Sequence, residues 1–137
     1  MTEIFFDSNV LVYTLTKGDP RQAVAARLLQ ENAGTVSVQV LNEVASVAHR
    51  KLKLSWADVA ETLADLRALC QEPRALTLAT HQAALALAAR HGFSFYDALI
   101  VAAALEAGCT TLLTEDMQDG LVVEGRLTLR NPFRQGA

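Results

Sequence analysis

The stretch SFYDALIVAAALEAGCTTLLTED, residues 94–116, decides the fold class because it joins a buried helix to a strand through a glycine. Ser94 is a typical helix-capping residue, and apolar side chains follow it around the whole helix, which we expect to end at Ala107 before Gly108. Thr110–Thr114 then has the composition of a short strand. A helix that returns directly into a strand is the repeating unit of a parallel α/β sheet.

The rest of the chain repeats this alternation of strand-like and helical segments. Further strands are expected at Glu3–Phe6, Thr35–Val38, Leu76–Leu78 and, as an edge strand, Arg126–Arg130. Helices are expected over residues 20–32, 40–52, from the cap Ser55 to just before Glu72-Pro73, and from the cap Thr80 to His91. Residues 115–120 fit a turn or a short helix. The order predicts an α/β protein whose parallel sheet carries helices on both faces.

The composition is that of an ordinary soluble protein. Of 137 residues, 51% are hydrophobic and 20% are charged, with a net charge of −3, so one domain over residues 1–137 is expected. The longest apolar run, Ala98–Leu105, is far shorter than the roughly 20 residues that span a bilayer. Because the N-terminus lacks a secretion signal and Cys70 and Cys109 lack paired spacing, we expect a cytoplasmic protein with reduced thiols and no membrane association.

Basic residues gather in two places despite the negative net charge. One group is HRKLK, residues 49–53, and the other is the tail with Arg126, Arg130 and Arg134. These groups are either a solvated helix end and a solvated tail, or a basic rim that binds phosphates beside an acidic centre. Charge counting leaves both interpretations open.

Four acidic residues are predicted to meet at one edge of the sheet. Asp7 and Asp116 each follow a strand, and the carboxyl ends of parallel strands share an edge. About twelve helical residues rise roughly 18 Å, and about five strand residues rise roughly 17 Å. Asp97, in the first turn of its helix, is therefore level with the end of the strand that follows. Glu43 similarly falls in the first turns of the helix that leaves the second strand.

Each of these acids also has an ordinary structural explanation. Asp97 fits a capping box with Ser94, Asp7 a turn or the cap of the next helix, Glu43 a solvated helix position and Asp116 a turn. Their convergence favours a site, because two like charges about 4 Å apart repel by about 4 kcal/mol at an effective dielectric of about 20. A cation would relieve that repulsion, and a carboxylate cluster without Cys or His suits Mg²⁺ or Mn²⁺. The three histidines are interpreted as surface or helix-end residues.

Four short motifs resemble the PIN-domain signature in their order and spacing. They are Asp7-Ser8-Asn9-Val10-Leu11, Asn42-Glu43-Val44, Phe95-Tyr96-Asp97-Ala98-Leu99-Ile100 and Leu113-Thr114-Glu115-Asp116. The resemblance spans almost the whole chain, and the size of the chain is similar to that of VapC-type toxins. It implies a three-layer α/β/α sandwich around a mostly parallel sheet of about five strands.

The resemblance also implies a function and roles for individual residues. It implies a Mg²⁺-dependent endoribonuclease that forms a homodimer and is inhibited by a VapB-type antitoxin. Asp7 and Asp97 would be the principal metal ligands, and Glu43 and Asp116 would complete a catalytic quartet. The supporting residues would be Ser8, Asn9 and Thr114, with Asp119 as a secondary fifth acid.

Three other functions compete with this interpretation. The first is a PIN nuclease of RNA processing that has no antitoxin, and the second is a non-catalytic PIN-fold domain that binds a protein partner. The third, a phosphatase with an aspartyl nucleophile, would need a second Asp where Asn9 stands and a characteristic Lys further along the chain, whose only lysines are 17, 51 and 53. With no nucleophilic Ser, Cys or Lys motif, the quartet favours attack by water with metal assistance over covalent catalysis.

Overall fold

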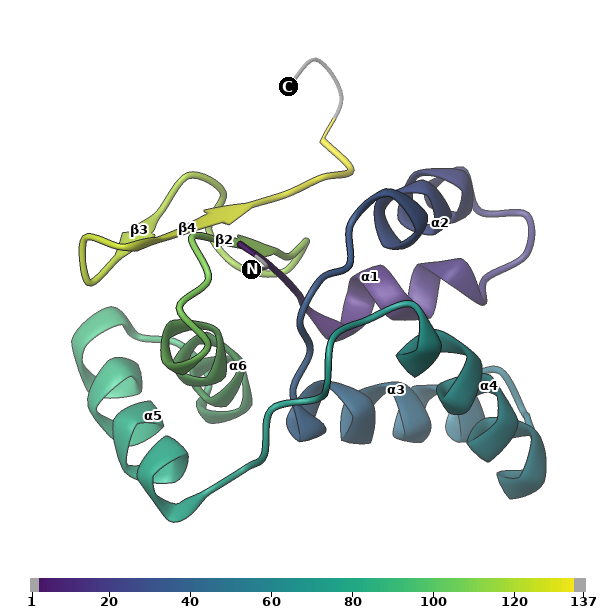
Figure 1. Cartoon of the computed structure of the whole chain (residues 1–137), viewed down its shortest axis with the longest axis horizontal. Coiled ribbons are helices and arrows are strands. Elements are labelled where there is room, and N and C mark those ends of the chain that lie inside the picture. Colours follow the sequence, from purple (N-terminus) through teal and green to yellow (C-terminus); the bar gives the residue numbers. More distant parts are fainter. Residues whose placement is uncertain (1–2, 135–137) are drawn as a thin grey trace.

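The computed structural model describes residues 3–134 and shows a sheet flanked by six helices (Figure 1). The elements follow one another as β1 (Ile4–Phe6), α1 (Ser8–Thr14), α2 (Arg21–Glu31), α3 (Val38–Arg50), α4 (Trp56–Ala68), α5 (Leu78–His91), α6 (Phe95–Glu106), β2 (Thr111–Leu113), β3 (Val122–Val123) and β4 (Leu127–Arg130). This arrangement confirms the predicted α/β class.

The sheet has the strand order β1-β2-β4-β3. β2 lies parallel to both β1 and β4, while β3 pairs antiparallel with β4. Two isolated parallel bridges, Phe5↔Thr35 and Ser37↔Arg74, extend the pairing beyond β1. The sheet is thus mostly parallel, with four strands in the described part of the chain where about five were expected.

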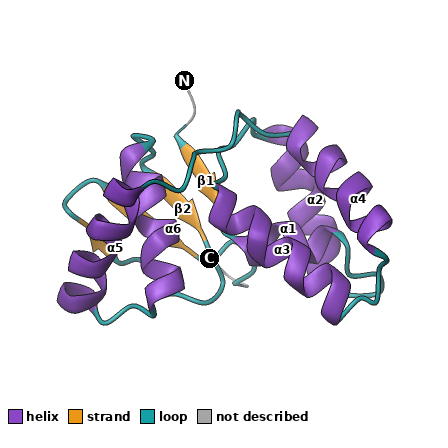
Figure 2. Cartoon of the chain, turned by 90° about the horizontal axis from the view of Figure 1, so that it is seen from below, coloured by secondary structure: helices purple, strands orange, loops and turns teal. Residues whose placement is uncertain are grey.

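The helices fall into two groups around this sheet. Helices α5 and α6 pack against each other and cover one side of the strands, whereas α1 to α4 gather beyond β1 (Figures 1 and 2). No helix in residues 3–134 has the length and apolar character needed to cross a membrane.

Helix α6 is buried along most of its length, as its sequence predicts. Every residue from Ala98 to Ala104 is buried, and α6 contacts both α5 and α3. Ser94 caps it through a hydrogen bond from the Asp97 N–H to Oγ (3.2 Å). Fully buried residues of β1, β2 and β4, including Phe5, Phe6 and Leu112, share the same core cluster.

Two strand predictions need correction. The segment predicted as a strand over Thr35–Val38 is extended through Ser37 and forms only two isolated bridges, because Ser37 caps α3 and Val38 is already helical. Leu76–Leu78 forms no strand, because Thr77 rather than Thr80 caps α5 and the two threonines form a capping box.

The C-terminal strand and the first helix also differ from expectation. The segment predicted as an edge strand lies inside the sheet as β4, between β2 and the unpredicted β3. The unpredicted helix α1 begins directly after β1 and is capped by Asp7, whose side chain accepts from the Ser8 N–H.

Gly34, just before the Thr35 bridge, is required by packing rather than by backbone conformation. A Cβ built on Gly34 would lie 2.3 Å from a carbon of the Phe6 ring. The ring is fully buried, so it has little room to move aside.

Candidate active site

Asp7 lies at the centre of the candidate site, at the carboxyl end of β1. Its backbone N–H donates to the Leu113 carbonyl (3.0 Å), which joins the ends of the two parallel strands. Its side chain is 1% exposed. One carboxylate oxygen accepts from the Ser8 N–H (2.6 Å) and the other from the Thr114 hydroxyl (2.7 Å). The fold therefore holds this acid in one orientation.

Burial makes ionisation of Asp7 unfavourable. Desolvation raises its pKa to about 7, although the hydrogen bonds from Thr114 and Ser8 act in the opposite direction, and repulsion from Asp97 and Glu43 raises it further. A carboxylate in this position needs a positive partner in order to be ionised.

Ser8 and Asn9 join Asp7 to two other acids of the predicted quartet. The Ser8 hydroxyl donates to Glu43 Oε1 (2.7 Å) and lies 3.3 Å from Asp7 Oδ1. Asn9 Nδ2 donates to Asp116 Oδ2 (3.1 Å) and lies 3.5 Å from Asp7 Oδ2. These two small polar side chains thus separate the carboxylates while holding them on one side of the molecule.

Asp97 approaches the group from the first turn of α6. It is half-buried, and burial is the main cause that raises its pKa. The hydrogen bond from Ser94 lowers the pKa, while repulsion from Asp116 and Glu43 raises it further. Asp97 therefore belongs to the capping site of α6 and also lies within electrostatic reach of the other acids. The structure brings all four predicted residues to the same edge of the sheet.

Asp119 does not join this group. It accepts from the Asn131 N–H (2.9 Å) and forms an ion pair with Arg134 (2.9 Å). The hydrogen bond from the Asn131 N–H lowers the pKa of Asp119 most, and the hydrogen bond from Arg134 lowers it further. Its contacts connect the loop after β2 to the segment after β4, so we assign it a structural part rather than the secondary site role expected from the sequence.

The oxygen donors of the four acids fit a hard divalent cation, but in this structure the carboxylates are further apart than the ligands of a bound ion. None of the four ion pairs in residues 3–134 involves Asp7, Glu43, Asp97 or Asp116. All-oxygen donors of this kind suit Mg²⁺ or Mn²⁺. Within the same residues, no three Asp, Glu, His or Cys side chains stand close enough to form a ready-made ligand group. Both oxygens of Glu43 already accept hydrogen bonds, one from Ser8 and one from Gln39 (3.0 Å), so ligation of a metal ion would require it to leave at least one of these partners.

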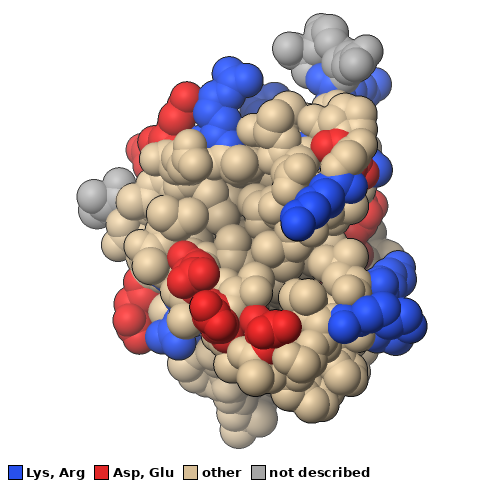
Figure 3. Space-filling view, turned by 90° about the vertical axis from the view of Figure 1, so that its right-hand side faces the viewer, with Lys and Arg blue, Asp and Glu red and all other residues tan. Residues whose placement is uncertain are grey.

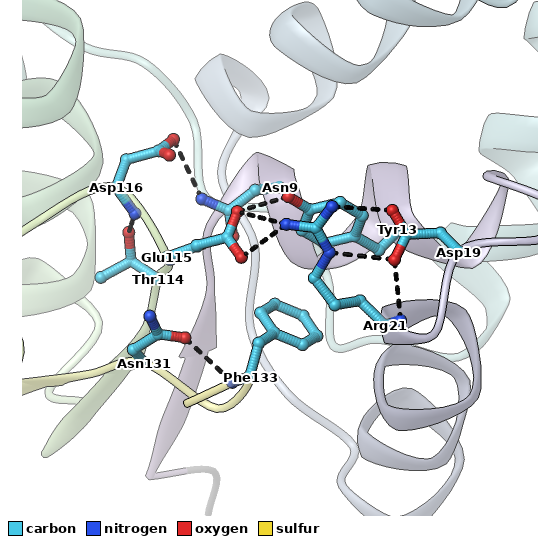
Figure 4. A network of polar contacts seen from close by, with 9 residues as sticks. All are labelled: Asn9, Tyr13, Asp19, Arg21, Thr114, Glu115, Asp116, Asn131 and Phe133. Carbon is cyan, nitrogen blue, oxygen red and sulfur yellow. Dashed lines mark hydrogen bonds and ion pairs between the residues drawn. The ribbon is translucent and has the colours of Figure 1, made fainter. Parts of the chain in front are cut away.

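A second polar network, which the sequence did not reveal, supports the loop that carries Asp116 (Figure 4). Arg21 donates to both oxygens of Glu115 (2.9 and 3.3 Å) and to both oxygens of Asp19 (2.7 and 2.9 Å). Its guanidinium lies 4.1 Å from the centre of the Tyr13 ring, and the Tyr13 hydroxyl donates to Glu115. Burial and then the Glu115 hydrogen bond raise the pKa of Tyr13 to about 12.

This network reaches the acids through one backbone group. The Glu115 N–H donates to Asn9 Oδ1 (3.3 Å), and the same Asn9 amide group binds Asp116 through its nitrogen. Arg21 and Glu115 are separated by 94 positions, so no local pattern could have predicted the pair. Arg21 holds this loop to α2, while Tyr13 and Asn9 hold it to α1.

The fold and this site define an α/β protein with converging acids at the carboxyl edge of a mostly parallel sheet. The family model of the PIN domain matches residues 4–118. The chain belongs to the PIN domain family. Comparison with curated proteins gives no match.

Three solved structures share the fold. The chain is similar to the sarcin-ricin loop cleaving toxin VapC20 of Mycobacterium tuberculosis, with 22% identity, coverage of 82% of this chain and 89% of that chain, and a TM-score of 0.68. A toxin–antitoxin complex from Klebsiella pneumoniae has 20% identity, coverage of 95% and 98%, and a TM-score of 0.71. VapBC2 from Rickettsia felis, bound to a promoter DNA fragment, has 19% identity, coverage of 93% and 97%, and a TM-score of 0.62.

Proposed function

We propose that this protein is a Mg²⁺-dependent endoribonuclease that hydrolyses RNA phosphodiester bonds. The observation that carries the proposal is the convergence of Asp7, Glu43, Asp97 and Asp116 with no cationic side chain paired to them in residues 3–134. Membership of the PIN family and the structural similarity to a sarcin-ricin loop cleaving toxin support the choice of RNA as substrate.

Asp7 and Asp97 would hold the metal ion, with Mn²⁺ as an alternative, and Glu43 and Asp116 would complete its surroundings. A bound divalent ion supplies charge stabilisation at the scissile phosphate and lowers the pKa of an attacking water. Thr114 and the Ser8 N–H orient Asp7, while Asn9 orients Asp116.

We further propose that the protein is the toxin of a VapBC-type pair, acting in the cytoplasm as a homodimer. Two of the structurally similar proteins are toxin–antitoxin assemblies, which supports an antitoxin partner. Coexpression with the product of a small neighbouring reading frame should abolish growth inhibition by this protein. If expression never inhibits growth, an RNA-processing nuclease without an antitoxin is the better assignment.

The decisive experiment measures cleavage of labelled total RNA by the wild type, Asp97→Asn and a control, Asp65→Asn. Asp65 is an exposed acid of α4 and makes no ion pair in the described residues. We expect cleavage by the wild type and by Asp65→Asn with Mg²⁺, none with EDTA, and none by Asp97→Asn despite an unchanged circular dichroism spectrum. Cleavage that ignores EDTA would contradict the metal requirement. Absence of both cleavage and Mg²⁺ binding would instead identify a non-catalytic interaction domain.

A further inference from the structure

Trp56, the only tryptophan of the chain, lies largely exposed at the start of α4. Its side chain is 63% exposed, the second most exposed of the large hydrophobic residues described. The His49 imidazole stacks on the indole, with 3.7 Å between ring centres and 14° between planes. A planar ring supported from one side and open to solvent is suited to stack with another planar group.

The segment that presents Trp56 is held in a defined conformation. His49 Nδ1 lies 2.9 Å from the Leu54 carbonyl oxygen, which fixes the orientation of the imidazole. Ser55 caps α4 by accepting from the Asp58 N–H (3.1 Å). Lys53 adopts a left-handed backbone conformation with φ of 62°, which closes the turn between α3 and α4. The stacked rings are therefore preorganised, and binding would cost little conformational entropy.

Unpaired positive charge lies next to these rings along the chain. Arg50, Lys51 and Lys53 are exposed, and none takes part in the four ion pairs of residues 3–134. We call His49, Arg50, Lys51, Lys53 and Trp56 the α3–α4 cluster. It corresponds to the first of the two basic groups in the sequence, whose role the proposed catalytic site leaves unexplained.

The acids of α4 point away from this cluster. At about 100° per residue, Asp58, Glu61 and Asp65 lie roughly 140° to 180° around the helix axis from Trp56. On the face seen in Figure 3, three acidic groups lie in a row, and basic groups lie both across the upper part of that face and at its edges. Carboxylates on α4 therefore do not cancel the positive charge beside the rings.

The cluster is also aligned with the candidate site along α3. Arg50 follows Glu43 by seven residues, which places it about 10.5 Å further along the helix and within about 20° of the same face. A polynucleotide that reaches the acids near Glu43 can continue along this face of α3 to Arg50 and then to Trp56.

We propose that the α3–α4 cluster binds single-stranded RNA, with a base stacked on Trp56 and backbone phosphates on Arg50, Lys51 and Lys53. The proposal rests on RNA being the substrate of the proposed nuclease. Base stacking on an exposed aromatic ring tolerates any base, and flexible cations follow the backbone without reading sequence. The cluster therefore strengthens binding and leaves the choice of cleavage sequence to other contacts.

The test uses the intact protein in EDTA, so that binding is measured without cleavage. Because Trp56 is the sole tryptophan, its fluorescence should be quenched when a single-stranded oligoribonucleotide is added. In anisotropy titrations with a labelled oligoribonucleotide, Trp56→Ala should bind about ten-fold or more weakly, and Trp56→Phe should restore most of the affinity. Leu78→Ala, which alters another exposed apolar side chain (70% exposed), is the matched control.

The charged residues have their own readout. Lys51→Gln and Lys53→Gln should each reduce the slope of log Kd against log salt by about 0.7, whereas Arg67→Gln, an exposed cation elsewhere on α4, should leave it unchanged. With Mg²⁺ present, Trp56→Ala should raise KM and leave kcat within about two-fold, because stacking remote from the acids acts on ground state and transition state alike.

The outcomes separate this proposal from the catalytic one. Quenching of Trp56 by RNA without any Mg²⁺-dependent cleavage would support the cluster and contradict the nuclease. Cleavage with an unchanged KM in Trp56→Ala, or no quenching, would overturn the cluster and leave the nuclease intact. A change only in dimerisation or antitoxin binding in Trp56→Ala, with RNA affinity unaltered, would also overturn it in favour of a protein interface.

Discussion

Replacing Asp7 with Asn should stabilise the metal-free protein at neutral and alkaline pH. Burial raises the pKa of Asp7 from 3.8 to about 7. Between those values the folded protein keeps a proton that the unfolded chain has released, so the free energy of unfolding falls as pH rises. At about 1.4 kcal/mol per pH unit, the loss reaches about 4 kcal/mol by pH 7 and then levels off.

Asn cannot ionise and so avoids this loss. Its amide must donate to the Thr114 hydroxyl, which now donates to Asp7, and we estimate about 1 kcal/mol for that rearrangement. The Asp7→Asn variant should therefore be about 1 kcal/mol less stable than wild type near pH 4, and about 3 kcal/mol more stable near pH 8.

Urea unfolding in EDTA across this pH range measures the difference directly. Asp65→Asn, at an exposed position, is the control and should follow the wild type closely. Added Mg²⁺ should then stabilise the wild type and not Asp7→Asn. A stability difference between Asp7→Asn and wild type that stays constant with pH would refute the argument that desolvation dominates at Asp7.

Three further predictions follow from other contacts. The affinity of the wild type for Mg²⁺, measured by calorimetry, should weaken as pH falls below about 7 because protonated Asp7 cannot ligate, and a pH-independent affinity would contradict this. Arg21→Gln should lower kcat several-fold and weaken Mg²⁺ binding, because the loop that carries Glu115 loses its ion pair with Arg21. Lys17 is a nearby cation that forms no ion pair in residues 3–134, so Lys17→Gln should have no effect. Gly34→Ala should lower the free energy of unfolding by about 1–3 kcal/mol because its Cβ would overlap the Phe6 ring, and unchanged unfolding in urea would show that this ring has room to move.

The sequence predicted elements best where a cap or a fully apolar helix marked them. Ser94 and Ser55 cap α6 and α4 as expected, and the uninterrupted burial of Ala98–Ala104 matches the lack of a polar face. The errors fall on very short segments. Helix α1 has seven residues and β3 has two, too few to show a hydrophobic period.

The meeting of the acids was predictable because it follows from topology. Residues directly after two neighbouring parallel strands must lie at one edge, and this places Asp7 beside the loop of Asp116 whatever the details of packing. The Arg21–Glu115 pair and the attachment of Asp119 to Arg134 depend on how distant loops settle against each other. No local spacing encodes such contacts, so only the structure could reveal them.

The clustered acids also limit where positively charged side chains can lie in this molecule. A cation side chain next to Asp7 would neutralise the carboxylates and occupy the place of a metal ion, so phosphate-binding residues must lie elsewhere. A chain with a net charge of −3 also has no general attraction for a polyanion. Local cations about two helical turns from Glu43 satisfy both requirements, since they attract RNA without pairing with the acids. Moving such a charge inward, as in Val47→Lys one turn after Glu43, should therefore weaken Mg²⁺ binding measured by calorimetry even if RNA affinity rises. A variant in which both affinities rise together would show that the separation of charges is not a constraint on this site.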